Sequence, residues 1–112
     1  MTSDKFIRNR LASLRAELVT LSEQSAEARA TVTLDQQSVG RLSRMDALQT
    51  QAMAKAAEAR RSQEIARIDA AFKRVDEGTY GECLRCGEEI EPARLDFDPA
   101  ATLCADCARR NG

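Results

Sequence analysis

Four cysteines near the end of the chain restrict its fold more than any other feature of the sequence. They form two C-x-x-C pairs, Cys83 with Cys86 and Cys104 with Cys107, separated by residues 87–103. This spacing is found in disulfide frameworks, in redox centres and in four-cysteine zinc sites. The chain contains no His that could replace a cysteine as a ligand. Four thiolates complete a tetrahedron and leave no open position, so a zinc bound here would be structural.

The surrounding sequence favours metal binding over the other two interpretations. No βαβ pattern flanks either pair, which counts against a thioredoxin-like redox site. The start MTSDKFIRNR lacks the apolar segment of a signal peptide, and no apolar run is long enough to span a membrane. We therefore expect a soluble, cytoplasmic protein, in which disulfides are rare.

The segment 78–112 is too short to be stable through a hydrophobic core alone, and metal binding can supply the difference. We predict one structural Zn²⁺ held by Cys83, Cys86, Cys104 and Cys107, and we expect Gly87 to relieve the backbone as the chain reverses after Cys86. The residues expected to form a small core around the cysteines are Tyr80, Ile90, Leu95, Phe97 and Leu103.

The residues before the cysteines have the periodicity of two amphipathic helices. The first apolar stripe has heptad spacing and consists of Ile7, Leu11, Leu14, Leu18 and Leu21. The second consists of Val39, Leu42, Met45, Leu48, Ala52, Ala56, Ala59, Ile65, Ile68, Phe72 and Val75. Gly78 is suited to end the second helix. Two such helices bury their stripes best as an antiparallel hairpin.

The sequence therefore predicts a mainly α protein with two parts. Residues 1–77 form a long antiparallel helical hairpin, or coiled coil, and residues 78–112 form a small four-cysteine zinc-finger module with a C-terminal helix. We expect the bend at residues 30–35, where β-branched residues precede a capping box from Thr33 to Gln36. The alternative is a bend near Gly40 with a box from Ser43 to Asp46.

Charge separates the two parts and limits their partners. Residues 1–77 carry 13 basic and 11 acidic side chains, and residues 78–112 carry 4 and 7. An acidic module lacks the clustered cations with which a protein neutralises DNA phosphates. A protein partner is therefore favoured over nucleic acid. The alternative is that the zinc-finger module binds nucleic acid or another protein. A thiol oxidoreductase is disfavoured because zinc-bound sulfurs are not free nucleophiles. An intermolecular coiled coil is the alternative to a monomer.

The residues around the cysteines form a longer motif, Tyr80-Gly81-x-Cys83-x2-Cys86-Gly87-x2-Ile90-x3-Arg94-Leu95-x3-Pro99-x4-Cys104-x2-Cys107. It resembles the zinc finger of the DksA/TraR family, and the predicted hairpin is similar to the coiled coil of that family. The resemblance implies a transcription regulator that is not an enzyme and binds RNA polymerase directly. It also implies that the coiled-coil tip enters the secondary channel and modulates initiation, often together with the alarmone ppGpp.

The chain departs from the family pattern at two places. The acidic D-x-x-D-x-A arrangement at the tip is absent, and the charged residues near the predicted bend are Asp35, Arg41, Arg44 and Asp46, which we expect to contact the partner. Asp98 stands where the family has a basic residue before the finger proline, although Arg67 is retained. We therefore expect little or no dependence on ppGpp, and we expect a monomer that binds neither specific DNA sequences nor membranes.

Overall fold

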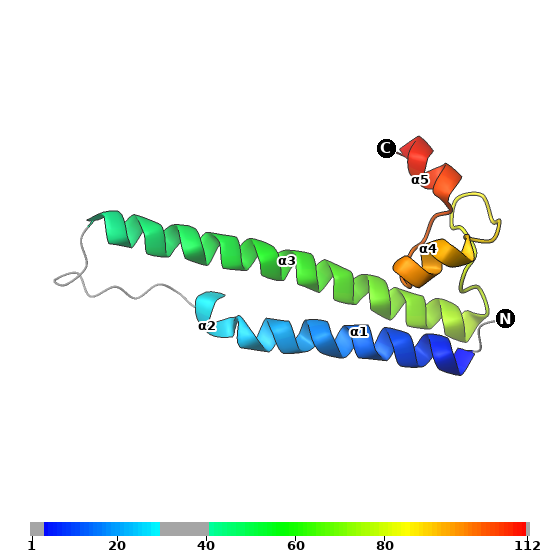
Figure 1. Ribbon diagram of the computed structural model, residues 1–112, viewed down its shortest axis with the longest axis horizontal. Helices are drawn as coiled ribbons and strands as arrows, with labels where there is room; N and C mark the ends of the chain where they lie inside the picture. Colours follow the sequence, from blue (N-terminus) through cyan, green and yellow to red (C-terminus); the bar gives the residue numbers. More distant parts are fainter. Residues whose placement is uncertain (1–3, 30–40, 112) are drawn as a thin grey trace. The chain divides into compact units, whose positions relative to one another are not determined.

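The computed structural model describes residues 4–29 and 41–111, and these residues are mainly helical (Figure 1). The helices are α1 (Asp4–Gln24), α2 (Ala26–Arg29), α3 (Arg41–Glu77), α4 (Pro92–Phe97) and α5 (Ala105–Asn111). Within the described ranges no strand is formed, and Glu82 and Glu89 make an isolated antiparallel bridge. The prediction of a helical hairpin followed by a small cysteine module is confirmed.

Contacts divide the chain into two compact units, and each unit contains parts of both long helices. The first unit comprises Met1–Ala16 and Ala66–Gly112, and the second comprises Glu17–Ile65. The first unit thus joins the beginning of α1 and the end of α3 to the whole cysteine module. A domain boundary between residues 77 and 78, as expected from the sequence, stays a prediction.

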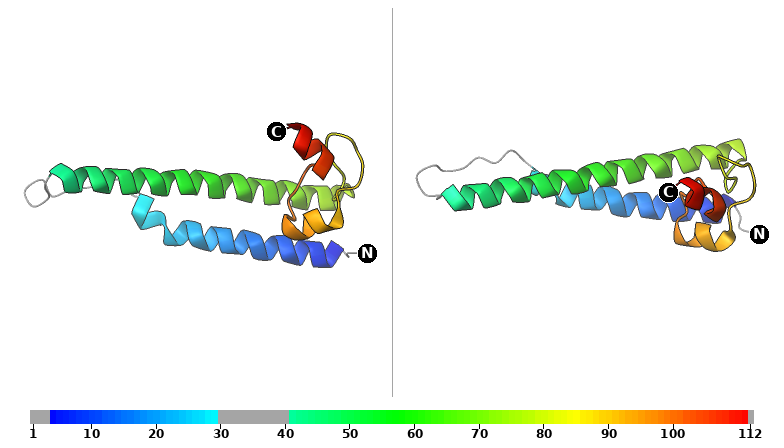
Figure 2. Two further views of the ribbon diagram at one scale, coloured as in Figure 1. Left: turned by 45° about the horizontal axis from the view of Figure 1, so that its top comes forward. Right: turned by 90° about the horizontal axis from the view of Figure 1, so that it is seen from above.

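The core of the helices in the first unit follows the predicted heptads. Leu11 and Ile68 are fully enclosed, and Val75, one heptad after Ile68 on α3, is also buried. Ion pairs join Arg8 to Asp76 at 2.6 Å and Arg15 to Asp69 at 2.8 Å, so the residue number falls along α3 as it rises along α1. The two segments therefore run antiparallel, and Figure 2 shows them side by side from two directions.

The end of α3 is set by a glycine in the left-handed conformation. Gly78 has a φ of +79°, and its N–H donates to the carbonyl of Val75 at 3.2 Å. The N–H of Thr79 donates to the carbonyl of Arg74 at 2.9 Å. These two bonds are the Schellman arrangement, which satisfies carbonyls that the helix leaves without partners. The role predicted for Gly78 is confirmed.

In the second unit, several residues of the predicted apolar stripes are exposed. Met45 and Leu48 are exposed, as are Ala52, Ala56 and Ala59, and Leu21 of α1 is 48% exposed. The less exposed residues of α3 include a series that continues the heptads counted back from Val75. Its members are Phe72, Ile68, Ile65, Arg61, Glu58, Ala54, Gln51 and Ala47. The predicted stripe was wrong in this region because the true seam contains polar residues, while alanines on the outer face imitate an apolar stripe.

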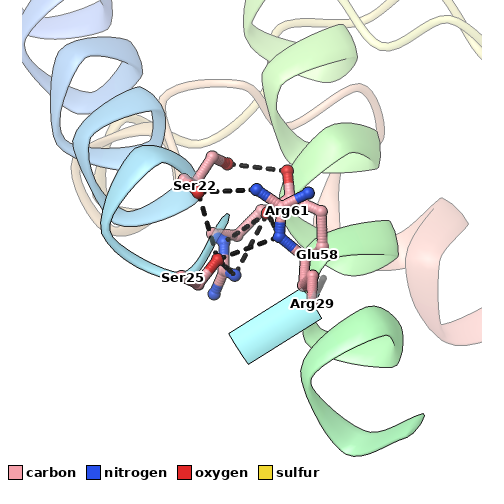
Figure 3. Close-up of polar contacts among 5 residues, drawn as sticks. All are labelled: Ser22, Ser25, Arg29, Glu58 and Arg61. Atoms are coloured by element: carbon pink, nitrogen blue, oxygen red, sulfur yellow. Dashed lines mark hydrogen bonds and ion pairs between the residues drawn. The ribbon is translucent and has the colours of Figure 1, made fainter. Parts of the chain in front are cut away.

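A cluster of five polar residues occupies this seam where α1 gives way to α2 (Figure 3). The hydroxyl of Ser22 donates to Glu58 Oε1 at 2.8 Å, and Arg61 Nη2 donates to Ser25 Oγ at 2.8 Å. Arg29 Nη2 donates to the carbonyl of Ser22 at 2.7 Å, which satisfies a backbone oxygen near the end of α1. Arg29 and Arg61 both form ion pairs with Glu58, at 3.5 and 3.1 Å.

The bend of the hairpin can be compared with the sequence only in part. The favoured bend at residues 30–35 and the box from Thr33 to Gln36 lie outside the described residues. The alternative box is wrong, because Ser43 is already helical within α3 and so cannot be its N-cap. In the described ranges, no helix has the length and apolarity needed to cross a membrane.

Candidate metal centre

The four cysteines converge on one point in the first unit. Their sulfur atoms all lie within 4.8 Å of one another, and the sulfurs of Cys86 and Cys104 are 3.8 Å apart. A zinc ion with four sulfurs at about 2.3 Å separates neighbouring sulfurs by about 3.8 Å in a regular tetrahedron. All four cysteines are free thiols. The disulfide interpretation therefore does not apply, and the arrangement fits a single tetrahedral ion.

Short backbone hydrogen bonds hold the first cysteine pair in a tight turn. The N–H of Cys83 donates to the carbonyl of Glu88 at 2.8 Å, and the N–H of Gly87 donates to the carbonyl of Cys83 at 2.9 Å. Gly87 has a φ of +79°, which confirms the prediction that the reversal after Cys86 needs a glycine. This turn directs the sulfurs of Cys83 and Cys86 to the same side.

The second pair lies at the start of α5. The N–H of Ala108 donates to the carbonyl of Cys104 at 2.9 Å, so Cys104 and Cys107 lie on the first helical turn. The Glu91 carboxylate accepts the N–H of Ala105 at 3.1 Å and thereby satisfies one donor at this helix start. This role of Glu91 was not predicted from the sequence. Its position directly before Pro92, the first residue of α4, marks a helix start but does not reveal a contact with α5.

The small core around the cysteines is confirmed for Ile90, Leu95 and Leu103, while a place for Tyr80 in it stays a prediction. Ile90 is buried with three of the cysteines, and Leu95 and Leu103 pack against them. The hydroxyl of Tyr80 donates to the carbonyl of Pro99 at 2.7 Å. Phe97, in contrast, is 91% exposed, so its predicted place in the core was wrong. On α4 it follows Leu95 by two residues, or about 200° of rotation, and therefore points away when Leu95 points inward.

The electrostatics of the cysteine cluster suit a divalent cation. Backbone N–H groups, first that of Cys104 and then that of Cys86, lower the pKa of Cys83 to about 6. Burial, followed by the neighbouring thiols, raises the pKa of Cys107 to about 12. Crowded sulfurs cannot all ionise unless a positive charge lies between them, and zinc supplies that charge. Four soft thiolates are the donor set of a structural zinc site.

Arginine side chains connect this module to the helices of its unit. Arg10 of α1 donates to the carbonyls of Leu95 and Asp96, the first at 3.2 Å. Arg67 of α3 donates to the Asp98 carboxylate at 2.8 Å and to the carbonyl of Ala100 at 3.3 Å. Arg67 and Asp98, the two residues compared with the family pattern in the sequence, therefore form an ion pair with each other.

The residues expected to contact a partner are far from the cysteines in sequence, in the second unit. Arg44 and Asp46 are exposed on α3, and Arg41 is the first residue of that helix. Asp35 lies outside the described residues. Asp46 is in the second turn of α3, so it does not cap the helix start. A contact with a partner stays a prediction for all four residues.

Comparison with known proteins agrees with the geometry of the cysteine module. The family described as "Prokaryotic dksA/traR C4-type zinc finger" matches residues 78–111. The protein named "RNA polymerase-binding transcription factor DksA" in Caulobacter vibrioides is 43% identical over 47 residues, which cover 42% of this chain and 33% of that protein. Its Escherichia coli namesake is 42% identical over 43 residues, or 38% of this chain and 28% of that one. The matched segment spans about a third of these relatives.

Solved structures extend the similarity to the helices. Transcription factor DksA2 from Pseudomonas aeruginosa matches with a TM-score of 0.78 and 26% identity, over 96% of this chain and 81% of that one. A Chlamydia trachomatis protein described as RNA polymerase binding protein and transcriptional regulator matches in fold, with a TM-score of 0.56 at 22% identity, over 98% and 91% of the chains. The chain therefore carries a C4-type zinc finger of the DksA/TraR family, with cysteines arranged for one structural zinc ion, on the helical fold of a DksA protein.

Proposed function

We propose that this protein is a transcription regulator that binds RNA polymerase directly. The observation that carries the proposal is the similarity in fold to DksA2 over nearly the whole chain, together with the DksA/TraR finger at residues 78–111. The relatives that share the finger are named for binding RNA polymerase. In this proposal the end of the hairpin formed by α1 and α3 enters the secondary channel and modulates initiation. A polymerase partner also requires a cytoplasmic protein.

The zinc module has a structural role in this function. Cys83, Cys86, Cys104 and Cys107 each supply one thiolate to Zn²⁺, and the closed tetrahedron leaves no site for a substrate. The ion instead fixes the turn after Cys83 and the start of α5. The finger then holds the ends of α1 and α3 through Arg10 and Arg67. The protein accordingly performs no chemistry and acts by binding.

The charged residues before and at the start of α3 are the proposed polymerase contacts. Arg44 and Asp46 are exposed on α3, where a partner can reach them, and Arg41 and Asp35 precede them in the sequence. Charged groups at such a surface control the rate and specificity of association more than raw affinity. We therefore propose that these charged residues control the effect on initiation, while the rest of the protein provides most of the affinity for RNA polymerase.

The arrangement around Asp98 supports little or no dependence on ppGpp. A phosphate ligand is held best by several cations that are available to it. Here the Arg67 guanidinium donates to Asp98 and to the carbonyl of Ala100, and the Asp98 carboxylate repels phosphate. Residues 78–112 carry a net charge of −3, which also opposes binding of the finger to DNA. A monomer is proposed because α1 and α3 cover each other within one chain.

Transcription with purified bacterial RNA polymerase tests the proposed function. The zinc-loaded protein should change the yield of initiation at responsive promoters, and added ppGpp should not increase the effect. Asp46→Asn should weaken the regulation while polymerase binding is retained. If the unmodified protein has no effect on any promoter and does not bind the polymerase, the proposal fails. If ppGpp strongly increases the effect of the protein on initiation, the role given to Asp98 is contradicted, but the proposed binding to RNA polymerase is not.

A further inference from the structure

An open pocket of about 320 Å³ lies in the first unit, between the first turns of α1 and the zinc finger. Its apolar lining comes from Phe6 and Ile7 on the helix and from Ile90, Pro92 and Leu95 on the finger. Ile90 is buried in the core around the cysteines, so zinc binding also fixes this wall. The pocket is therefore formed by the folded protein before any partner arrives.

Two neighbouring residues of the finger, Tyr80 and Gly81, line the pocket on the side of the cysteine module. Gly81 lines it with a φ of +87°, and a Cβ at this position would meet Leu95 at 3.7 Å. The hydroxyl of Tyr80 is held by the carbonyl of Pro99 at 2.7 Å. Phe6 lines the pocket and is 57% exposed, which is a large exposure for an apolar residue of this size. An apolar side chain entering from outside would cover it.

Three acidic residues also line this pocket. Glu82 and Glu89 face each other across the antiparallel bridge, both are exposed, and Asp96 is a third acid on the lining. Like charges on directly paired residues oppose pairing, so this arrangement costs the finger stability. The cation on the lining, Arg10, donates to the carbonyls of Leu95 and Asp96 and forms an ion pair with the Asp96 carboxylate at 3.8 Å, so Glu82 and Glu89 carry the uncompensated charge. The pocket thus presents a net negative rim to a ligand.

We propose that this pocket is a docking site for a protein segment that inserts an apolar side chain and carries Lys or Arg next to it. An apolar centre with a charged rim is the usual structure of a protein interface, and a filled central pocket contributes most of the binding. The negative rim excludes phosphate ligands and selects a basic segment by charge. The identity of the partner rests on the function proposed above, so the segment belongs to RNA polymerase.

The test compares two neighbouring exposed glutamates, of which only Glu89 lines the pocket and pairs with Glu82 across the bridge. Glu89 lines the pocket, whereas Glu88 is exposed but is not on the lining. Glu89→Lys and Glu88→Lys change the net charge equally. Each labelled, zinc-loaded protein is titrated with RNA polymerase core, and zinc content and circular dichroism establish that both variants are folded. Phe6→Ala removes an apolar wall without changing charge.

Glu89→Lys should weaken polymerase binding by about tenfold, with Glu88→Lys within about twofold of the unmodified protein. Phe6→Ala should also weaken binding, and the affinity of the unmodified protein should depend more on salt than that of Glu89→Lys. Equal effects of the two lysine variants would overturn the docking site while leaving the proposed function intact. If the unmodified protein does not bind polymerase, both proposals are overturned.

Discussion

Leu11 and Leu21 both belong to the predicted apolar stripe of α1 but have different surroundings. Leu11 is fully enclosed in the first unit, whereas Leu21 is 48% exposed in the second. Next to Leu21, the Ser22 hydroxyl donates to Glu58 of α3. The sequence spacing treats the two leucines alike, so only the structure separates a core residue from a surface residue.

Truncating these leucines should have unequal effects on stability. Leu11→Ala removes a fully buried side chain and should reduce the free energy of unfolding by about 2–5 kcal/mol. Leu21→Ala, with the same chemical change on a half-exposed side chain, should cost less than half as much. Urea unfolding followed by circular dichroism measures both. Equal losses would show that Leu21 is buried as deeply as Leu11.

Gly78 gives a second prediction for a single residue. Its φ of +79° is unfavourable for a side chain, although a Cβ would meet no atom within 4 Å. Gly78→Ala should therefore reduce the free energy of unfolding by about 1 kcal/mol through backbone strain alone. Gly78→Asn should recover part of the loss, because asparagine tolerates this conformation better. Thermal unfolding of the three proteins checks this, and a stabilising Gly78→Ala would contradict it.

Among the secondary-structure elements, the long helices were predictable but their contact face was only partly so. From Ile65 to Val75 the apolar residues are large, and the predicted seam is correct. From Ala47 to Arg61 the seam residues are alanine, glutamine, glutamate and arginine, so a pattern of apolar residues selects the wrong face. On that face Glu58 and Arg61 make hydrogen bonds to Ser22 and Ser25, and periodicity does not reveal such bonds.

The polar cluster gives α1 and α3 a pH dependence. The Ser22 hydroxyl, and then the Arg61 and Arg29 cations, hold the pKa of Glu58 below its ordinary value of 4.5. A lowered pKa in the folded state stabilises the protein above the pKa of the unfolded state. This stability is lost as the pH falls from 4.5 through the lower folded value.

Glu58→Gln should therefore lower the Tm at neutral pH, and the difference from the unmodified protein should shrink on acidification below pH 4.5. The difference is the informative quantity, because acid also displaces zinc from thiolates in both proteins. Glu17→Gln, at an exposed residue of the same unit, is the matched control and should have little effect at either pH. A Tm difference for Glu58→Gln that is independent of pH would show that the Glu58 charge has no role in the cluster.

In the whole molecule, the cysteine module could be predicted more completely than the hairpin. The four ligands, Gly87 and most of the small core follow from spacing, because one ion must be reached by all four sulfurs. The attachment of the module could not be predicted, since it depends on Arg10 and Arg67, two residues distant in sequence from the groups they contact. The place of Phe97 depends on the rotation of α4, which composition does not determine.

Loss of one zinc ligand should unfold the finger but not the helices. Cys83→Ser leaves three thiolates, and structural zinc contributes on the order of 10 kcal/mol to such modules. Zinc content should fall well below one ion per chain, and proteases should cut residues 78–111 while most of the helical circular dichroism remains. Ser3→Ala, a change of similar size far from the cysteines in sequence, is the control. Unchanged zinc content and protease resistance would show that Cys83 is not a ligand.

Retention of RNA polymerase core by the purified, zinc-loaded protein, with zinc measured on the same sample, tests the central claim most directly. A regulator with this finger and this fold should contain one zinc ion per chain and retain the polymerase, whereas Cys83→Ser should lose the zinc and retain less polymerase. One zinc ion per chain without retained polymerase would contradict the proposed function and leave only the fold and the metal centre.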